Sequence, residues 1–489
     1  MNVRPEQDPR RPRRDRARHP GAAHRLGAAL TLLLCGFAQA QDDGLARLVT
    51  ADAARLLHSP DPLVRGEAAL VVSAGGANAW HGRIAELTTD PDPAARARAI
   101  VAVGLQSAPG SPLLLADLLD EGRGHTSTDR TAAAFAVGLL APDLAGTLTS
   151  SVLTGFLRGN LRREQDPLLA LLLGLAQRDP QAHAASLLRV YDDDSLRDAR
   201  IRAQLLHLLL RAGHTFDLRQ LRRLLERSSA DERTALLRWF ADGDAVVADD
   251  LLPVVERLAR QGGAGERAAA LATLTRRRHL PALEIAARAM RSSDAVECGQ
   301  GLRSVLAIGG AGMRRALERH LIAEDDPVRK TALLTNFAAP PSTELLAHAA
   351  ALAADGGQPF DVRTAGAVLV ARSDPARAAP LLRDLFRATT RTESLPQLAA
   401  LLAQGGEPPP LEKLLHGPCD LVHHPAQWQA LLAVEHPAAV RQLLATLEPR
   451  GDAAAQGLAL QAWRRARVLS LPLPVVGEPP ATLRAALGD

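Results

Sequence analysis

The sequence predicts an all-α protein, folded as a right-handed α-solenoid of stacked antiparallel helix pairs. Residues 61–65 read Asp-Pro-Leu-Val-Arg, and the related stretch Asp-Pro-Ala-Ala-Arg follows 31 residues later at 92–96. The letters Ala-Val-Gly-Leu occur at 102–105 and again at 136–139, 34 residues apart. A fixed period of this size indicates small structural units that bury their apolar faces against neighbouring units.

Each unit begins with a strong helix start. Asp61 can cap a helix by accepting a backbone hydrogen bond, and Pro62 suits the first helical position, which needs no N–H donor. The apolar residues that follow have helical spacing and are Val64, Ala68, Ala69, Val71 and Val72. Gly75-Gly76 ends this helix, and a second helix is expected from about residue 80 to residue 87. One unit is therefore two short helices and a turn.

This signature resembles the HEAT repeat family in its short bacterial form, Asp-Pro-x-Val-Arg-x-x-Ala-Ala. The match is good at 61–69 and 326–332, and partial at 92–100, 129–138, 197–209 and 361–371. The resemblance implies that the Asp and Arg lie at the turn and at the start of the second helix, where they form ladders between repeats. The positions concerned are Asp61, Arg65, Asp92, Arg96, Asp326, Arg329 and Arg363, with Arg130 and Arg233 in weaker units.

The amino terminus has the pattern of a secretory signal peptide, expected to span residues 1–40. Eight arginines between residues 4 and 25 precede an apolar stretch at 26–37, and Ala38-Gln39-Ala40 fits a cleavage site. The apolar stretch is shorter than the ~20 residues that span a bilayer. Cleavage would leave Gln41 first in an exported protein, periplasmic or extracellular. The alternative is a short anchor that is not cleaved.

Two breaks divide the rest of the chain. The predicted HEAT-like solenoid covers 41–404, with a turn at 339–342 leading into a capped helix. A Gly-Gly-Glu-Pro-Pro-Pro stretch at 405–410 cannot continue a helix, so a smaller set of C-terminal helical repeats is expected over 405–469. Residues 470–489 read as an extended Pro-rich tail, expected to lie along the last helix as a cap.

Charge disfavours a nucleic-acid partner. The whole chain carries a net +4, whereas the leader carries +5, so the remainder is close to −1. Nucleic-acid-binding proteins need a basic face. We therefore expect no nucleic-acid partner. We also expect no membrane span after cleavage of the leader, and no small-molecule substrate is evident.

The sequence contains no zinc-protease, phosphate-loop or nucleophile-elbow pattern, and we expect no cofactor. The glycines at 263–265 and 309–312 are interpreted as interhelical turns, and Asp192-Asp193-Asp194 as a capped helix start. One cluster has the side chains that bind zinc or copper, namely His416, Cys419, His423 and His424. Its spacing matches no metal motif, which favours surface-loop residues over metal ligands.

Two cysteines, Cys298 and Cys419, remain beyond the leader, 121 residues apart. Packed helices lie ~8–10 Å apart, so about three units of a continuous solenoid would separate the two by well over the ~7 Å that a disulfide allows. No intramolecular bridge is predicted.

The function that best fits these observations is an exported, non-enzymatic scaffold. A superhelix presents a long concave surface, which the second helix of each unit should line, and such surfaces bind proteins or peptides. Two alternatives stay open: a metal-dependent or lyase-like enzyme, or enzyme subunit, built on HEAT repeats, and a structural component of an envelope assembly.

Overall fold

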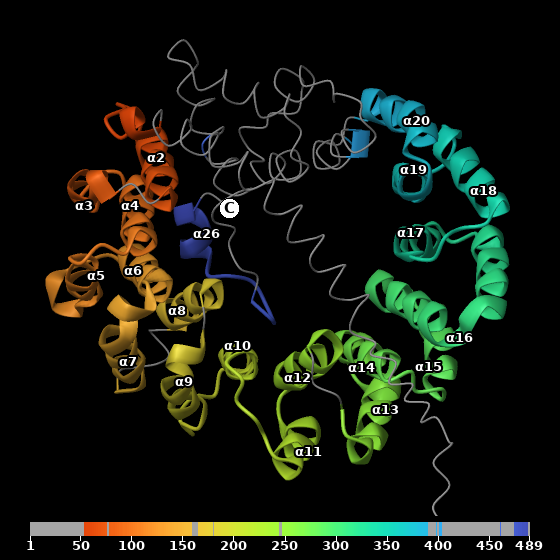
Figure 1. Cartoon of the computed structure of the whole chain (residues 1–489), viewed down its shortest axis with the longest axis horizontal. Helices are drawn as coiled ribbons and strands as arrows, with labels where there is room; N and C mark the ends of the chain where they lie inside the picture. The colour runs from red at the N-terminus through yellow and green to blue at the C-terminus, as the bar shows by residue number, and fades with distance from the viewer. Residues whose placement is uncertain are drawn as a thin grey trace, which may run out of the picture.

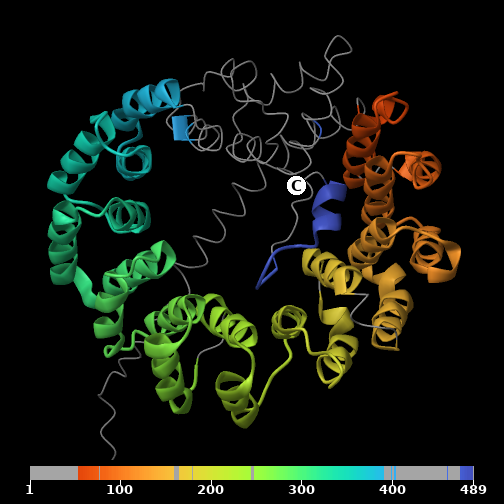
Figure 2. The same ribbon diagram turned by 180° about the vertical axis from the view of Figure 1, so that it is seen from behind.

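The computed structural model describes residues 53–75, 78–158, 165–178, 180–243, 247–389 and 474–487, with isolated positions at 398, 401, 402 and 460. All regular elements in these stretches are helices, as predicted. They follow a curved path from α2 through α12 to α20 around an open centre (Figure 1), and the view from behind shows the same arc (Figure 2). The predicted leader, the boundary at 405, and the repeats of 405–469 apart from residue 460 lie outside the described residues.

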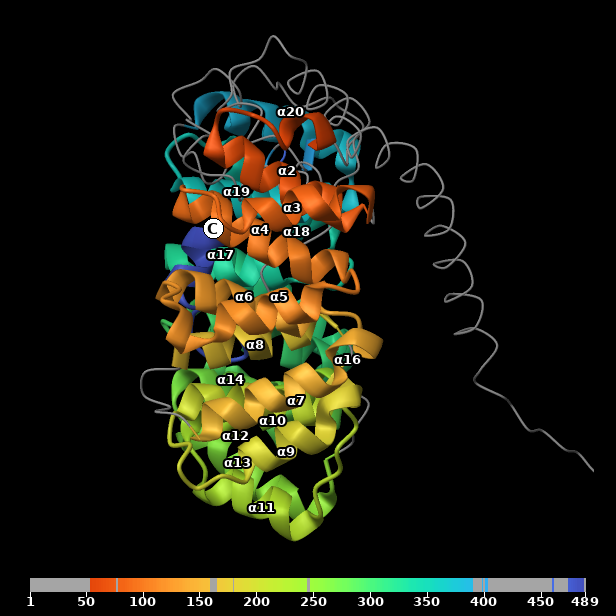
Figure 3. The same cartoon turned by 90° about the vertical axis from the view of Figure 1, so that its left-hand side faces the viewer.

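The arc has two layers of helices. The inner layer consists of α2 (Pro62–Ala74), α4 (Pro93–Gln106), α6 (Ser127–Leu139), α8 (Gln165–Gln177), α10 (Ala199–Arg211), α12 (Ala230–Asp242), α14 (Ala264–Arg276), the first part of α16 (Ala295–Ala323), α17 (Pro327–Asn336) and α19 (Phe360–Ser373). The outer layer consists of α3 (His81–Leu87), α5 (Ser111–Leu119), α7 (Pro142–Arg158), α9 (Ala184–Tyr191), α11 (Leu218–Arg227), α13 (Leu252–Gln261), α15 (Ala282–Ala289), α18 (Thr343–Ala354) and α20 (Pro375–Ala388). Figure 3 shows outer helices α3, α5 and α7 one above another. Short 3-10 turns join some of them, at Asn78–Trp80, Glu121–Arg123, Pro180–His183 and Asp249–Leu251.

Composition decides which layer a helix joins. Inner helices pack against the preceding inner helix, the next one and the outer layer, so they need apolar residues on most sides. In α6 every residue from Thr131 to Leu139 is buried. By contrast Leu225 is the only fully buried residue of α11, and half of its ten residues are charged. The small Ala and Gly residues of the inner helices suit close packing between them.

Glycine is required where two inner helices approach most closely. A Cβ on Gly104 would overlap the carbonyl oxygen of Ala136 in the next inner helix. A Cβ on Gly138 would lie 2.6 Å from the carbonyl oxygen of Leu171. These glycines belong to the repeated Ala-Val-Gly-Leu letters, so that repeat marks successive contacts in the inner layer.

The predicted helix caps are present. The Asp61 carboxylate accepts the Val64 N–H at 3.2 Å, Asp92 accepts the Ala95 N–H at 2.8 Å, and Asp326 accepts the Arg329 N–H at 2.8 Å. Each residue satisfies one of the backbone donors that a helix start leaves free. The expected turn at 339–342 ends in Ser342, whose hydroxyl accepts the Leu345 N–H at the start of α18.

An arginine four residues after the cap links each of several inner helices to the next. Its Nε donates to a carboxylate at the start of the following inner helix, and its Nη1 donates to a loop carbonyl before its own helix. The carboxylate contacts are Arg65–Asp90 at 2.9 Å, Arg96–Asp129 at 2.9 Å, Arg202–Glu232 at 3.1 Å, Arg233–Glu266 at 2.6 Å and Arg267–Glu297 at 2.7 Å. Because each guanidinium reaches both its own loop and the next helix, it fixes their relative position.

The accepting carboxylate also caps its own helix. Glu266 accepts Arg233 on one oxygen and the Gly263 N–H on the other, the latter at 2.9 Å. Asp129 does the same with Arg96 and the Thr126 N–H. One acidic residue therefore stabilises the helix start and joins it to the preceding unit.

The other ends of the inner helices are joined by a second set of arginines. Each donates from the end of one inner helix to a carbonyl near the end of the preceding inner helix. The contacts are Arg178 to Leu139 at 3.0 Å, Arg211 to Ala176 at 3.0 Å, Arg276 to Ala241 at 3.0 Å and Arg372 to Thr335 at 2.6 Å. These bonds satisfy carbonyl groups that have no partner within their own helix.

Several sequence expectations need correction. The helices that begin with the signature Asp and Arg line the inside of the arc. Counted from Asp-Pro, these are the first helices of their units, and second helices such as α3 lie in the outer layer. The expectation that the second helix of each unit lines the concave face is therefore wrong. Residues Asp192–Asp194 do not start a helix: α9 ends just before them and α10 is capped by Asp198. Arg329 pairs with Glu324, which precedes its own helix, and Arg363 donates to the Ala353 carbonyl.

The glycines at 309–312 do form a turn. Gly310 has φ of 67° and ψ of −167°, values that break α16 into two helical parts. That left-handed φ suits glycine, which lacks the Cβ that would clash there. In the other glycine motif, at 263–265, Gly263 caps α14 after the turn from α13, whereas Gly265 lies inside the first turn of α14.

The chain end departs most from expectation. Residues 474–480 are extended, but Ala481–Leu487 form a helix, α26, which packs on α4 and α6 inside the arc. The tail is therefore partly helical and not wholly extended, and the helices expected just before it lie outside the described residues. Its leucines find an apolar surface on units that precede it by more than 300 residues.

One ion pair joins α2 and α4 in full burial, and it gives a test of the inner layer. Arg98 donates to Glu67 at 2.7 Å, and their side chains are 4% and 0% exposed. We expect Arg98→Ala to lower the free energy of unfolding of this region by about 3–5 kcal/mol, because Glu67 keeps a buried charge. The double variant Glu67→Leu with Arg98→Met should recover most of that loss. Hydrogen exchange in α2 and α4 measures both, and equal losses in the two variants would contradict the charge argument.

The ladder also predicts acid sensitivity. Hydrogen bonds from Arg267 lower the pKa of the ladder residue Glu297. The pair within the α17 unit behaves in the same way, because hydrogen bonds from Arg329 lower the pKa of Glu324 to about 2. A carboxyl with a lowered folded pKa stabilises the fold fully above its unfolded pKa of about 4.3. This contribution disappears as pH falls through the folded value. We expect ladder stability to decline between about pH 5 and pH 2.

Substitution of Glu297 tests this dependence. Glu297→Gln should lower the free energy of unfolding at pH 7 by on the order of 1–3 kcal/mol, the usual contribution of hydrogen bonds to charged groups. It should also reduce the difference in stability between pH 7 and pH 3, measured by urea unfolding. The control is Glu344→Gln, an exposed acid on α18. An unchanged pH dependence in the Glu297 variant would count against the ladder.

Candidate interaction surface

The inner face of the arc has two regions that differ in what covers them. Over α4, α6, α10 and α12 lies the chain's own C-terminal segment, residues 474–487 (Figure 1). On the other side of the arc, α16, α17 and α19 line an apolar pocket. We refer to these regions as the tail seat and the open pocket.

In the tail seat, two inner-helix side chains hold one residue of the extended segment. The Val475 N–H donates to the Gln204 side-chain oxygen at 2.8 Å, and Arg238 Nη1 donates to the Val475 carbonyl at 2.6 Å. Gln204 is buried in α10, so the bond satisfies a group that would otherwise be costly to bury. Both backbone groups of Val475 are thereby paired without any sheet. These two hydrogen bonds bind the main chain of the segment and not one of its side chains.

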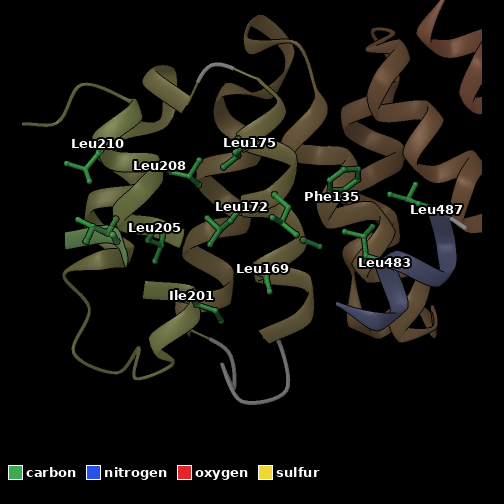
Figure 4. Close-up of a cluster of buried hydrophobic side chains, with 14 of the residues drawn as sticks. Phe135, Leu169, Leu172, Leu175, Ile201, Leu205, Leu208, Leu210, Leu483 and Leu487 are labelled. Carbon is green, nitrogen blue, oxygen red and sulfur yellow. The ribbon is translucent and has the colours of Figure 1, made fainter. Parts of the chain in front are cut away.

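The rest of the segment adds apolar contacts. Leu483 and Leu487 of α26 are fully buried, and Figure 4 shows them beside Phe135 of α6. The two leucines are four residues apart, so they lie on the same face of the helix. Burying a leucine contributes roughly 1.5–3 kcal/mol. These two side chains therefore supply the main apolar attachment of α26.

A histidine lies near the backbone clamp. Burial, together with the positive charges of Arg211 and Arg238, lowers the pKa of His207 to about 4. The imidazole is consequently neutral at neutral pH. Arg238 then faces no additional positive charge from this side chain as it binds the Val475 carbonyl.

The open pocket is an apolar hollow in the inner layer. It has a volume of about 490 Å³ and runs along α17 between α16 and α19. Val296 and Val328 line it and are 67% and 54% exposed, unusual values for valine. Pro327 and Pro359 extend the apolar lining. Exposed apolar surface of this kind marks sites of interaction.

Polar groups border this apolar floor. Arg303 donates to Asn336 on the next inner helix and to Gln300 at 2.7 Å on its own helix. Thr331 and Thr335 add hydroxyl groups along α17. A guanidinium and an amide side chain on successive inner helices therefore occur here as well as in the tail seat.

Of the signature residues named from the sequence, Arg65 and Arg96 make the contacts between units, and Asp61, Asp92 and Asp326 cap helices. Arg329 and Arg363 bind groups near the start of their own helices. Neither Gln204 nor Arg238 was among the sequence candidates, because an inner-face glutamine or arginine gives no periodic signal. The metal candidates His416, Cys419, His423 and His424 lie outside the described residues. Among the residues that the structure does describe, no three His, Cys, Asp or Glu side chains are grouped so as to hold a metal ion.

Comparison with known proteins gives no family. No protein-family model matches the chain, and a search of curated proteins also found no match. The HEAT resemblance therefore rests on the signature letters alone. Across the described stretches, no helix has both the length and the apolar character needed to cross a bilayer.

Cys298 gives a test of burial at the start of α16. Its thiol donates to the Met290 carbonyl at 3.3 Å, and burial raises its pKa to about 11. Since the thiolate is the reactive form, we expect maleimide at pH 8 to label Cys298 on the order of 10–100-fold more slowly in the folded protein than in urea. Timed labelling with peptide mapping measures the rate. Equal rates would mean that this part of α16 is open to solvent.

Proposed function

We propose that the protein is an exported, non-enzymatic protein-binding scaffold. In this proposal the chain is a right-handed solenoid of antiparallel HEAT-like helix pairs, and its concave face receives a protein or peptide. The curved array of paired helices supports this reading, since arrays of this kind use their concave surfaces for binding. Export is supported by the leader pattern of residues 1–40.

The observation that carries the proposal is the treatment of Val475. Side chains from two successive inner helices satisfy both polar groups of an extended segment, at 2.8 and 2.6 Å. Recognition of an extended peptide combines main-chain hydrogen bonds, which give affinity, with apolar sites for side chains, which give specificity. The inner face has both: the Gln204–Arg238 clamp, and the apolar surfaces of the tail seat and the open pocket.

The open pocket is the region available to a partner while the tail is seated. Its apolar floor and hydrogen-bonding rim have the composition expected of a binding site. A segment with an apolar side chain would bury Val296 and Val328, and its main chain would lie close to Arg303 and Asn336. No reaction chemistry is required of these residues.

Site-specific crosslinking can test the scaffold. A photoreactive amino acid replaces Val328 in the open pocket or, as the control, Leu113, which is 78% exposed on outer helix α5. In periplasmic extract we expect a discrete adduct from position 328 and none from position 113. Adding Thr335→Arg should abolish the adduct, because a bulky charged side chain would then occupy the apolar pocket.

Two outcomes would contradict the proposal. Equal adducts at both positions would indicate non-specific contact, and absence of any adduct at position 328 would remove the open pocket as a binding site. Metal analysis of the purified protein gives a separate check, because a tightly bound stoichiometric metal would favour the enzyme alternative.

A further inference from the structure

The seated C-terminal segment has features of a ligand held by the inner face. Its extended part, residues 474–480, is attached by the Val475 backbone bonds, and its helical part by two leucines. Gly477, Glu478 and Ala481 between these attachments are exposed. Between the two attachments, exposed residues therefore lie on both sides of the buried pair Pro479-Pro480.

Backbone shape contributes to the fit. Gly477 has φ of +81°, which side-chain-bearing residues rarely adopt. A Cβ at this position would also lie 2.9 Å from Cδ of Arg200 on α10. Pro479 and Pro480 follow and are buried, and they restrict the chain before α26 begins. The seat therefore selects a glycine, then prolines, then a short helix.

The segment balances its own charge. Arg484 pairs with Glu478 at 3.1 Å, both within the tail, while the seat contributes the uncharged Gln204 and apolar surface alongside Arg238. A helix of seven residues is also too short to be stable alone in water. The helical form of α26 consequently depends on its contact with α4 and α6.

We propose that the tail seat is a peptide-binding site that the chain's own C-terminal segment fills in the free protein. The proposal rests on the scaffold function and names the class of partner for this part of the concave face. The partner segment has an extended stretch with glycine and proline, followed by a short helix with leucines four residues apart. Such a segment binds by displacing the tail.

The covalent attachment of the tail determines how strongly it competes with a free peptide for the seat. A segment of the same chain binds its site intramolecularly, at an effective concentration on the order of 1 mM. For a site that binds the free peptide with a Kd of about 10 μM, this tether would weaken the apparent affinity about 100-fold. A variant whose own tail binds the seat more weakly should therefore bind the added peptide more tightly.

The experiment uses the full chain and a fluorescent synthetic peptide of residues 474–489, with binding measured by anisotropy. The first variant carries Leu483→Asp and Leu487→Asp in its own tail. We expect it to bind the peptide at least about tenfold more tightly than the unmodified protein does. The matched control, Ala481→Asp, changes an exposed tail position and should behave as the unmodified protein.

The seat is tested in the same background. Adding Gln204→Ala and Arg238→Ala to the leucine variant should weaken peptide binding at least about tenfold, because the Val475 backbone loses both partners. Helix content by circular dichroism reports whether each variant is folded. If the leucine variant loses helix, Gly477→Val replaces it, since this change affects only the extended half of the tail.

Two results overturn the inference. Equally weak peptide binding by the tail variants and the unmodified protein would show that the segment is a permanent brace. Tight peptide binding that is unchanged by Gln204→Ala and Arg238→Ala would show that the peptide binds elsewhere. Either result leaves the crosslinking test at Val328 unaffected, because that position lies in the open pocket on α17.

Discussion

The arginine that follows the helix cap by four residues, in five of the inner helices, is the contact on which the inner layer depends. It binds the loop before its own helix and the carboxylate that starts the next inner helix, so one side chain positions three segments. Arg233 and Arg267 show this arrangement in consecutive units, through Glu266 and Glu297. A charge-assisted bond of fixed geometry allows little freedom between neighbours. The curvature of the arc, and with it the shape of the concave face, follows from repeating this joint.

The sequence predicts the helices and their caps better than the contacts that join one helix to the next. The Asp-Pro letters identify real caps at Asp61, Asp92 and Asp326, because capping depends only on residues within one turn. The acceptor of each arginine could not be predicted in the same way. It is Asp90 before one helix and Asp129 inside the next, and the choice depends on how the loops between them pack.

The candidate site was harder still to predict. A concave binding face follows from the repeat, but the tail's position does not. Its leucines have no periodic relation to Phe135, and its contacts with Gln204 and Arg238 join residues 271 and 237 positions apart. An isolated proline-rich end therefore suggested only an extended cap. Only the folded structure shows that these leucines pack against the apolar inner surface of the arc.

The seated tail also gives the molecule an order of assembly. Contacts between successive inner helices are close in sequence, so each unit can form soon after it is synthesised. The tail bonds join residues far apart in sequence, so they form only after residues 474–487 have been synthesised. Until then this segment cannot cover the inner surfaces of α4, α6, α10 and α12. Occupancy of the seat by the chain's own segment thus marks a polypeptide whose synthesis has passed well beyond the helices that form the seat.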